Sequence, residues 1–170
     1  MGRALARRLP DGVDATFLGR EADRDAPDVL RERVGSVGMD VLVDVAGATD
    51  VEAAEREPGV AHRRNAVATG VLAELAARRG VAYLTVSTAY VFDGSGDAPW
   101  LPDAPTSPLN VYGHSKLAAE AAVREAGGTH LVLRTCAVID PDGRDFLGAV
   151  RSRRGPVEVV ADQVVGPTPA

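Results

Sequence analysis

The stretch Val41-Leu-Val-Asp-Val-Ala46 is short and mostly apolar on both faces, which is typical of a strand buried inside a parallel sheet. A long amphipathic segment, Ala61 to Arg79, follows it and ends at Gly80. A second apolar run, Val81 to Val86, comes directly afterwards. A strand, a helix of more than ten residues and another strand make a βαβ crossover. The sequence therefore predicts a parallel α/β sheet built around these segments.

The same alternation continues in both directions along the chain. We expect further helices at Gly2 to Leu9, Asp28 to Val34, Tyr112 to about Glu125 and Phe146 to Ser152, and further strands at Ala15 to Leu18, Leu131 to Arg134 and Val157 to Val160. Strands that alternate with helices in this way build a doubly wound sheet with helices on both faces. The fold class is therefore α/β with a doubly wound parallel sheet.

Composition excludes several classes of function. The 170 residues are 45% hydrophobic and 25% charged, as in one ordinary globular domain. The net charge of −5 is spread along the chain and aromatic residues make up only 4%, which argues against a nucleic-acid or anionic-membrane partner. No apolar run is long enough to span a bilayer, and the histidines show no metal-ligand spacing. The single Cys136 excludes an internal disulfide and fits the cytoplasm.

The stretch Pro108-Leu-Asn-Val-Tyr-Gly-His-Ser-Lys116 reads as a loop that enters a helix, with Asn110 or Pro108 at the start. Tyr112 and Lys116 are four residues apart and share one helix face. A phenol beside an ammonium can transfer a proton, and the cation is expected to lower the tyrosine pKa from its usual value of about 10. Lys116 is the only lysine of the chain. The buried side of this helix is predicted to consist of apolar residues, namely Leu117, Ala118, Ala121 and Ala122.

Polar residues follow the predicted strands at their carboxyl ends, where doubly wound sheets bind ligands. Ser87-Thr88 follows one strand, and Gly47-Ala48-Thr49 follows another. Thr88 by itself could simply cap a turn. Together with the Tyr112 phenol and the Lys116 ammonium, its hydroxyl predicts an active site at this rim of the sheet.

These motifs resemble the extended short-chain dehydrogenase/reductases, and most closely the dTDP-4-dehydrorhamnose reductase family. The resemblance rests on Ala46 to Glu55, Asn65, Ser87 to Gly94, Pro108 to Lys116, Leu133-Arg-Thr135 and Asp162-Gln-Val-Val-Gly-Pro-Thr168. It implies a cytoplasmic oxidoreductase that binds NADPH or NADH on a Rossmann sheet and reduces the C4 ketone of a nucleotide-linked 6-deoxysugar. It also implies that residues 1–155 form the dinucleotide-binding domain and residues 156–170 begin a substrate-binding region.

The resemblance also implies a role for individual residues. Tyr112 would be the general acid, Lys116 would bind the nicotinamide ribose and bias the ionisation of the tyrosine, and Thr88 would orient the carbonyl oxygen. The implied cofactor contacts are Gly2, Asp23, Ala46, Gly47, Ser87, Tyr112 and Lys116, and the implied substrate contacts are Thr49, Val51, Thr88 and Tyr90. No metal is implied.

Departures from the family pattern leave several alternatives open. Ala89 stands where the family usually has Asp, Ala137 where it has Trp, and Ala48 where an aromatic residue or His is common. All three lie on the substrate side, so the reaction type is predicted more firmly than the sugar. A non-catalytic binding or regulatory subunit is the alternative function. Arg20 could meet a 2′-phosphate and Glu21 could equally meet a 2′-hydroxyl, or the two could be a solvated turn pair, so the choice between NADPH and NADH stays open. A homodimer also stays open.

The start of the chain departs most from the family. A complete member begins with an apolar strand and a G-x-x-G-x-x-G turn that holds the cofactor pyrophosphate. Here Gly2 matches the last glycine of that turn, and the chain stops at Ala170 where the family continues. We therefore expect an interior fragment that binds dinucleotide weakly or not at all. The absent strand is expected to be the shared neighbour of residues 15–18 and 81–86.

Overall fold

The computed structural model describes residues 1–19, 22–140, 146–156, 158, 162 and 164–169. The chain divides into two compact units. One unit is Phe17–Arg134, and the other combines Met1–Thr16 with Thr135–Ala170. The division of residues 1–155 from residues 156–170 stays a prediction.

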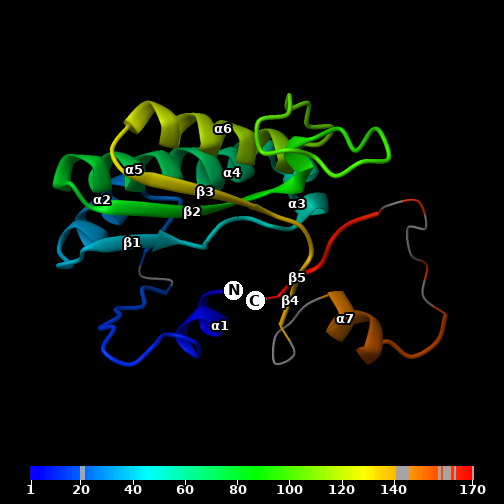
Figure 1. Ribbon diagram of the computed structural model, residues 1–170, viewed down its shortest axis with the longest axis horizontal. Helices are drawn as coiled ribbons and strands as arrows, with labels where there is room; N and C mark the ends of the chain where they lie inside the picture. The colour runs from blue at the N-terminus through cyan, green and yellow to red at the C-terminus, as the bar shows by residue number, and fades with distance from the viewer. Residues whose placement is uncertain (20–21, 141–145, 157, 159–161, 163, 170) are drawn as a thin grey trace. The chain divides into compact units, whose positions relative to one another are not determined.

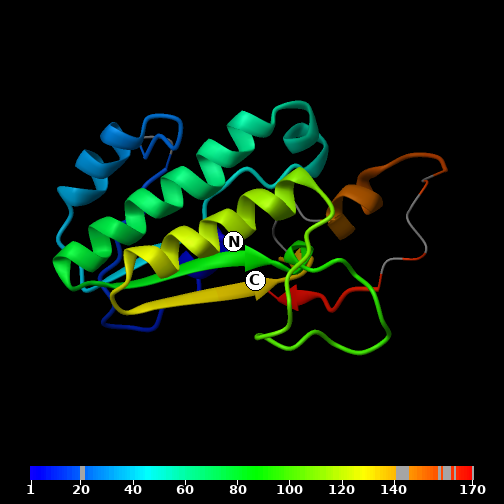
Figure 2. The same cartoon turned by 90° about the horizontal axis from the view of Figure 1, so that it is seen from above.

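The larger unit is built on a three-stranded sheet in the order β1-β2-β3. Its strands are β1 (Val41–Asp44), β2 (Ala82–Thr88) and β3 (His130–Thr135, of which the last residue belongs to the other unit). β1 and β2 are parallel, with Val41 opposite Ala82 and Asp44 opposite Thr85. The arrows of β2 and β3 point the same way in Figure 2. The parallel α/β fold predicted from the sequence is confirmed.

Helices cover one face of this sheet (Figure 1). They are α2 (Pro27–Gly35), α3 (Val51–Arg56), α4 (Pro58–His62), α5 (Ala68–Arg79) and α6 (Val111–Ala126). A five-residue π-helical turn, η1 (Arg63–Val67), joins α4 to α5, so the long helix expected from Ala61 forms with a bulge in it. α5 and α6 pack against each other and against β2. The core between helices and sheet includes Leu30, Leu72, Tyr83 and Val123.

Helix ends follow local sequence signals. The Asn110 side chain accepts a hydrogen bond of 2.7 Å from the Gly113 amide and begins α6, as expected. Gly80 ends α5 with a φ of 64°, a left-handed conformation that favours glycine. Helix α3 was not predicted, although Asp50 caps it by accepting from the Ala53 amide at 2.9 Å. No helix in the described ranges has the length and apolar character to cross a membrane.

The opposite face of the sheet is apolar and exposed. Val41 and Val43 on β1 are 56% and 39% exposed, and Leu131 and Leu133 on β3 are 50% and 42% exposed. Side chains alternate between the two faces of a strand, so these residues point away from α5 and α6. Within the larger unit, the described helices therefore cover one face of the sheet only.

Two predictions are wrong: the strand at residues 15–18, and the loss of a neighbouring strand for residues 81–86. Residues 15–18 are not a strand, and Phe17 is 53% exposed. A strand needs a ladder partner, and the sheet in the described ranges offers none to this segment. Residues 82–86 belong to β2, which has a neighbouring strand on each side because it lies between β1 and β3. The predicted strand at Val157 to Val160 falls mostly outside the described residues.

The predicted buried stripe of the Tyr112 helix is also wrong. Its buried residues are Tyr112, Gly113, Ser115, Lys116, Ala119, Glu120 and Val123. Leu117, Ala118 and Ala122 are only half-buried, and Ala121 is exposed. The helix is rotated so that a lysine and a glutamate face the protein interior in place of apolar residues. Polar groups inside a protein need partners, so this rotation points to a functional face.

The smaller unit contains short elements. They are α1 (Gly2–Ala6), β4 (Val138–Ile139), α7 (Phe146–Ser152) and β5 (Thr168–Pro169). β4 and β5 are parallel and form a two-stranded sheet. A nitrogen of the Arg7 guanidinium donates to both carboxylate oxygens of Asp140, at 3.0 and 2.8 Å. The two helices predicted for this unit, at Gly2 to Leu9 and at Phe146 to Ser152, are present as α1 and α7, although α1 is shorter than expected.

Candidate active site

Thr88 and Tyr112 meet at the carboxyl end of β2. Thr88 ends the strand, and its side-chain oxygen accepts from the Tyr90 amide at 3.2 Å. Tyr112 is the second residue of α6, and its ring lies edge-on to the Tyr90 ring, with 6.0 Å between centroids. The residues Thr88 and Tyr112 are only 6% and 9% exposed, and the Thr88 side chain lies close enough to the Tyr112 phenol to act on its pKa, in the lowering direction. The structure thus brings these two predicted groups together.

The ionisation of Tyr112 differs from the sequence-based expectation. Burial raises the pKa of the Tyr112 phenol, the polar side chain of Thr88 lowers it, and Tyr90 raises it. The net shift is upward, so the predicted lowering of this pKa is wrong for the protein on its own. Removing a phenol from water disfavours its charged form, and this effect is the largest here. Tyr112 is therefore protonated at neutral pH and can give up a proton.

Lys116 lies one helical turn beyond Tyr112 and is 6% exposed. Burial lowers the pKa of its ammonium, Asp44 raises it, Arg24 lowers it and Glu120 raises it, with a net lowering. Within the described part of the chain, the Lys116 side chain makes no hydrogen bond or salt bridge. A buried ammonium in this state can donate to a ligand.

A buried amide links this site to the turn after β1, and the sequence analysis gave it no role. Asn65, in η1, is completely buried. Its carboxamide accepts from the Ala48 amide at 2.8 Å and donates to the Ala48 carbonyl and to the Ser115 hydroxyl, both at 2.9 Å. Ser115 in turn donates to the Tyr112 carbonyl at 2.7 Å. The sequence signal for Asn65 is a lone amide side chain among the small apolar residues of the long helix.

A second buried polar cluster lies at the end of β1 and was also missed. The Asp44 carboxylate accepts from Arg24 at 2.9 Å, from the Tyr83 hydroxyl at 3.0 Å and from the Thr69 hydroxyl at 3.1 Å. Arg24 also donates to the Arg64 carbonyl at 2.7 Å. The cluster fixes the segment that carries Arg24. An aspartate within an apolar strand was the available signal.

The remaining predicted residues occupy several places. Ala46, Gly47 and Thr49 are exposed in the turn after β1, and Val51 begins α3. Asp23 is exposed, next to the anchored Arg24, and accepts from the Asp25 amide at 2.9 Å. The Ser87 hydroxyl donates to Glu120 at 2.6 Å. Gly2 begins α1 in the smaller unit, and Arg20 and Glu21 fall outside the described residues. The roles of all these residues stay predictions.

The turn after β1 fits close approach by a ligand. A Cβ atom added to Gly47 would lie 2.7 Å from Oδ1 of Asn65, so only glycine is compatible with the Asn65–Ala48 pairing. Ala46 and Gly47 therefore present backbone and little side chain at the rim. A strand-end turn of this kind is where a dinucleotide lies in a Rossmann-type sheet.

Close packing also fixes Tyr112. A Cβ atom on Gly113 would lie 2.3 Å from the Tyr90 carbonyl oxygen and 2.9 Å from Cβ of Pro108. We expect Gly113→Ala to lower the free energy of unfolding by about 1–3 kcal/mol, because the helix start must move away from the loop at Tyr90. Gly59→Ala, in α4 with nothing within 4 Å, is the matched control and should raise it by about 0.5–1 kcal/mol. Denaturant titration measures both, and equal stability of the two variants would contradict this packing.

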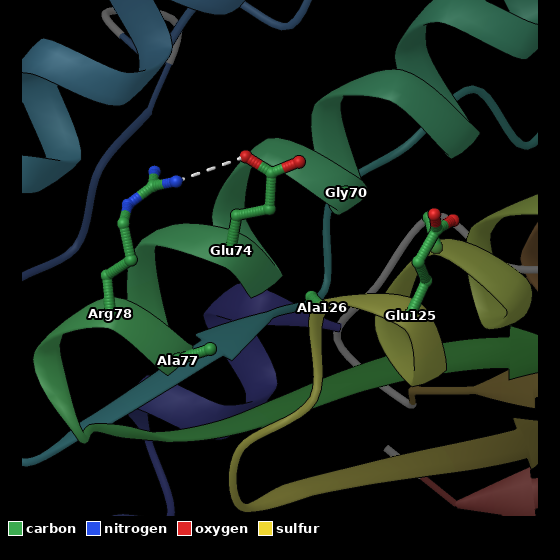
Figure 3. A pocket seen from close by; sticks show the side chains of 7 residues that line it. Gly70, Glu74, Ala77, Arg78, Glu125 and Ala126 are labelled. Atoms are coloured by element: carbon green, nitrogen blue, oxygen red, sulfur yellow. Dashed lines mark hydrogen bonds and ion pairs between the residues drawn. The ribbon is translucent and has the colours of Figure 1, made fainter.

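A hollow on the outer side of α5 and α6 is separate from these groups. It has a volume of about 330 Å³ and is lined by Gly70, Glu74, Ala77, Arg78, Ala122, Glu125 and Ala126 (Figure 3). Glu74 and Arg78 form an ion pair of 3.3 Å across one turn of α5. Neither Tyr112 nor Lys116 lines this hollow. It is therefore not part of the candidate active site.

A parallel sheet that carries α5 and α6 on one face, with a hydroxyl and a phenol at its carboxyl edge, defines a Rossmann-type α/β protein. Known proteins of this type share the fold over the whole chain. A crystal structure of dTDP-4-dehydrorhamnose reductase from Bacillus anthracis in complex with NADP matches with a TM-score of 0.91 and 26% identity, over 99% of this chain and 62% of that one.

The family model described as RmlD substrate binding domain matches residues 1–170, and the chain belongs to this family. Among its relatives, the dTDP-4-dehydrorhamnose reductase of Burkholderia thailandensis is 40% identical over 99% of this chain and 58% of its own length. The enzyme of the same name from Mycolicibacterium smegmatis is 42% identical over 99% of this chain and 53% of its own. The chain thus spans little more than half the length of these relatives.

Proposed function

We propose that the protein containing this chain is an NAD(P)H-dependent reductase of the 4-keto group of a nucleotide-linked 6-deoxysugar. The observation that carries the proposal is that the buried Thr88 side chain and Tyr112 phenol meet at the strand end, with Lys116 one helical turn further along α6. The names of the relatives support the substrate class, and the bound NADP of the Bacillus anthracis structure supports the cofactor.

The residues present fit a nicotinamide cofactor. Reduced nicotinamide, when bound, supplies a hydride to the carbonyl carbon. The Lys116 ammonium, which makes no hydrogen bond to the described residues, is suited to bind ribose hydroxyls. Ala46 and Gly47 leave backbone accessible at the strand end, and Asp23 lies in a segment held by the Arg24–Asp44 ion pair. These residues are proposed to hold the cofactor.

The chain's own side chains supply the proton and the orientation. Thr88 hydrogen-bonds the carbonyl oxygen of the sugar and aligns it with the phenol. Tyr112, kept protonated by burial, donates its proton to that oxygen as the carbon accepts the hydride, so that the ketone becomes a secondary alcohol. The phenolate that remains lies one turn from the Lys116 ammonium, and opposite charges stabilise each other most strongly where water is excluded.

The residues proposed to contact the substrate identify the sugar less specifically than Tyr112 identifies the reaction. Tyr90 is 38% exposed and stands beside Tyr112, so its ring is available to contact a sugar or a base. Its neighbour Ala89 and the turn residue Ala48 contribute only methyl groups. We therefore propose a nucleotide sugar as the substrate class, with dTDP-4-dehydrorhamnose as the first compound to test.

The test is cofactor oxidation by the protein that contains this chain. We expect NADPH or NADH to be consumed in equal amounts with a dTDP-4-keto-6-deoxysugar, and not with the corresponding sugar that already carries a 4-hydroxyl group. Absorbance of the reduced nicotinamide measures the rate, and mass spectrometry measures the sugar product. Binding of cofactor and sugar without turnover would contradict the reductase and favour the non-catalytic subunit.

A further inference from the structure

A buried carboxylate that the proposed mechanism does not use lies one turn beyond Lys116. Glu120 is 1% exposed and is among the largest fully buried side chains described. Burying a carboxylate costs several kcal/mol unless its oxygens are paired. Both carboxylate oxygens of Glu120 accept hydrogen bonds from protein donors, and these donors stabilise its charge in the interior.

The donors come from two neighbouring strands of the sheet. Ser87 of β2 donates its hydroxyl at 2.6 Å. Arg134 of β3 donates through Nε and Nη2, at 2.9 and 2.7 Å, to the two oxygens. Arg124 adds a longer contact of 3.4 Å from the same helix. Burial acts to raise the pKa of Glu120, but the hydrogen bonds from Arg134 and Ser87 outweigh it and lower the pKa. Glu120 is therefore an anion that joins α6 to β2 and β3.

The hydrogen bond between Glu120 and Ser87 is connected to the candidate active site because Ser87 and Thr88 are adjacent in the chain. Ser87 directly precedes Thr88, and Glu120 is on the same helix as Tyr112 and Lys116. The Glu120–Ser87 hydrogen bond thus ties the strand that carries one reacting group to the helix that carries the other two. Rotation or sliding of α6 over β2 would break it.

Arg134 extends the same connection to the loop between β2 and α6. Its guanidinium donates to the Pro102 carbonyl at 3.0 Å and lies 5.0 Å from the centre of the Phe92 ring. Phe92 stacks on Trp100, with 4.8 Å between centroids and 4° between planes. The stacked Trp100 ring anchors this loop. The loop leads into the start of α6, so its anchoring also bears on where Tyr112 stands.

We propose that Glu120 is a positioning residue for the reductase: through Ser87 and Arg134 it sets the distance and angle between Thr88 and the Tyr112–Lys116 face of α6. The inference rests on the proposed function for its effect on turnover. Hydride and proton transfer need reacting groups placed within fractions of an ångström, and a misplacement of about 1 Å can cost on the order of a hundredfold in rate. Glu120 acts through the groups that it holds, with no part in the chemistry.

The test is Glu120→Gln in the protein that contains this chain. Glutamine keeps the shape and one acceptor oxygen but loses the charge and the paired grip on Arg134. We expect kcat to fall about 10- to 100-fold while KM for the cofactor changes by less than about threefold. Glu125→Gln neutralises an exposed carboxylate on the outer side of the same helix and should change neither constant (Figure 3).

A double-mutant cycle separates positioning from general loss of stability. Ser87→Ala removes the donor next to Thr88 and should also lower kcat. The double variant Ser87→Ala/Glu120→Gln should lower kcat by less than the product of the two single effects, because both changes act on the same connection between α6 and β2. A kcat for Glu120→Gln within twofold of wild type would overturn the proposal, whatever happens to stability. Should Glu120→Gln fail to fold, Ser87→Ala decides the matter, since an unchanged kcat there overturns the proposal as well.

A structural readout keeps this inference separate from the reductase activity. Without any substrate, a crystal structure of Glu120→Gln should show the Thr88 hydroxyl displaced from the Tyr112 phenol relative to wild type, and a crystal structure of Ser87→Ala should show the same. Superimposable Thr88 and Tyr112 side chains would overturn the positioning role. Lack of turnover by the wild-type protein would contradict the proposed function and leave this comparison valid.

Discussion

Tyr112→Phe is expected to lower kcat for ketone reduction about a thousandfold, which corresponds to about 4 kcal/mol of transition-state stabilisation. Phenylalanine keeps the buried ring and its edge-on contact with Tyr90, so the change removes the acidic hydroxyl and little else. Cofactor binding should be nearly unchanged, because the ring and the Lys116 ammonium remain. Stopped-flow measurement of cofactor oxidation at saturating sugar separates the chemical step from binding.

A matched control for this variant is Tyr83→Phe. The Tyr83 hydroxyl is also buried, but it lies in the core between helices and sheet, where it donates to Asp44 at 3.0 Å. Its loss should lower the free energy of unfolding by about 1–3 kcal/mol and leave turnover within a few-fold of wild type. If Tyr112→Phe kept wild-type kcat, Tyr112 would not be the proton donor.

Lys116→Met is expected to produce an inactive and more stable protein. Burial lowers the pKa of Lys116, which means that the folded state disfavours the ammonium relative to the unfolded chain. Methionine fills a similar volume without this cost, so the free energy of unfolding should rise. Loss of the cation beside the forming phenolate should lower kcat/KM for reduction about 10²- to 10⁴-fold. Thermal unfolding and steady-state kinetics measure the two effects on the same samples.

The gain in stability from Lys116→Met should depend on pH in a defined direction. The folded-state pKa lies below the unfolded value of about 10.4, so the cost of the buried ammonium is fully present below the folded pKa. This cost diminishes as the pH rises from the folded-state pKa towards the unfolded-state pKa. The difference in free energy of unfolding between Lys116→Met and wild type should therefore shrink over this pH range.

Lys116→Arg is the control for the chemistry at this position. It keeps the charge but replaces the compact ammonium with a guanidinium fork, and we expect most of the activity to be lost. A Lys116→Met variant that is less stable than wild type and equally active would contradict both the electrostatic analysis and the catalytic role.

The fold could be predicted from the sequence where the signals are local. The apolar run at Val41 and the run after Gly80 identified β1 and β2, and Asn110 identified the start of α6. The strand at residues 15–18 was predicted in error because strand formation depends on a partner, and a ladder partner is not a local property. Likewise, α3 was missed because six residues are too few to show a helical period.

The candidate site was predictable as a set of chemical groups and only partly as a structure. The strand-end position of Thr88 and the helix start at Tyr112 were sufficient to place these two residues together, with Lys116 one turn along the same helix. Asn65 and Asp44 each carry the signal of a polar residue within an apolar segment, but that signal does not identify their partners, and Glu120 carries no signal until long-range contacts bury it. The same burial reversed the expected direction of the Tyr112 pKa shift, because desolvation depends on everything that surrounds the ring.

The central claim is that Thr88 and Tyr112 jointly bind the oxygen of a ketone that is being reduced. The most direct test is a crystal structure of the protein that contains this chain with oxidised cofactor and a dTDP-4-keto-6-deoxysugar. We predict that the C4 oxygen of the sugar lies within hydrogen-bonding distance, about 2.6–3.2 Å, of both the Tyr112 phenol and the Thr88 hydroxyl. A sugar bound with its keto group away from both hydroxyls would contradict the account.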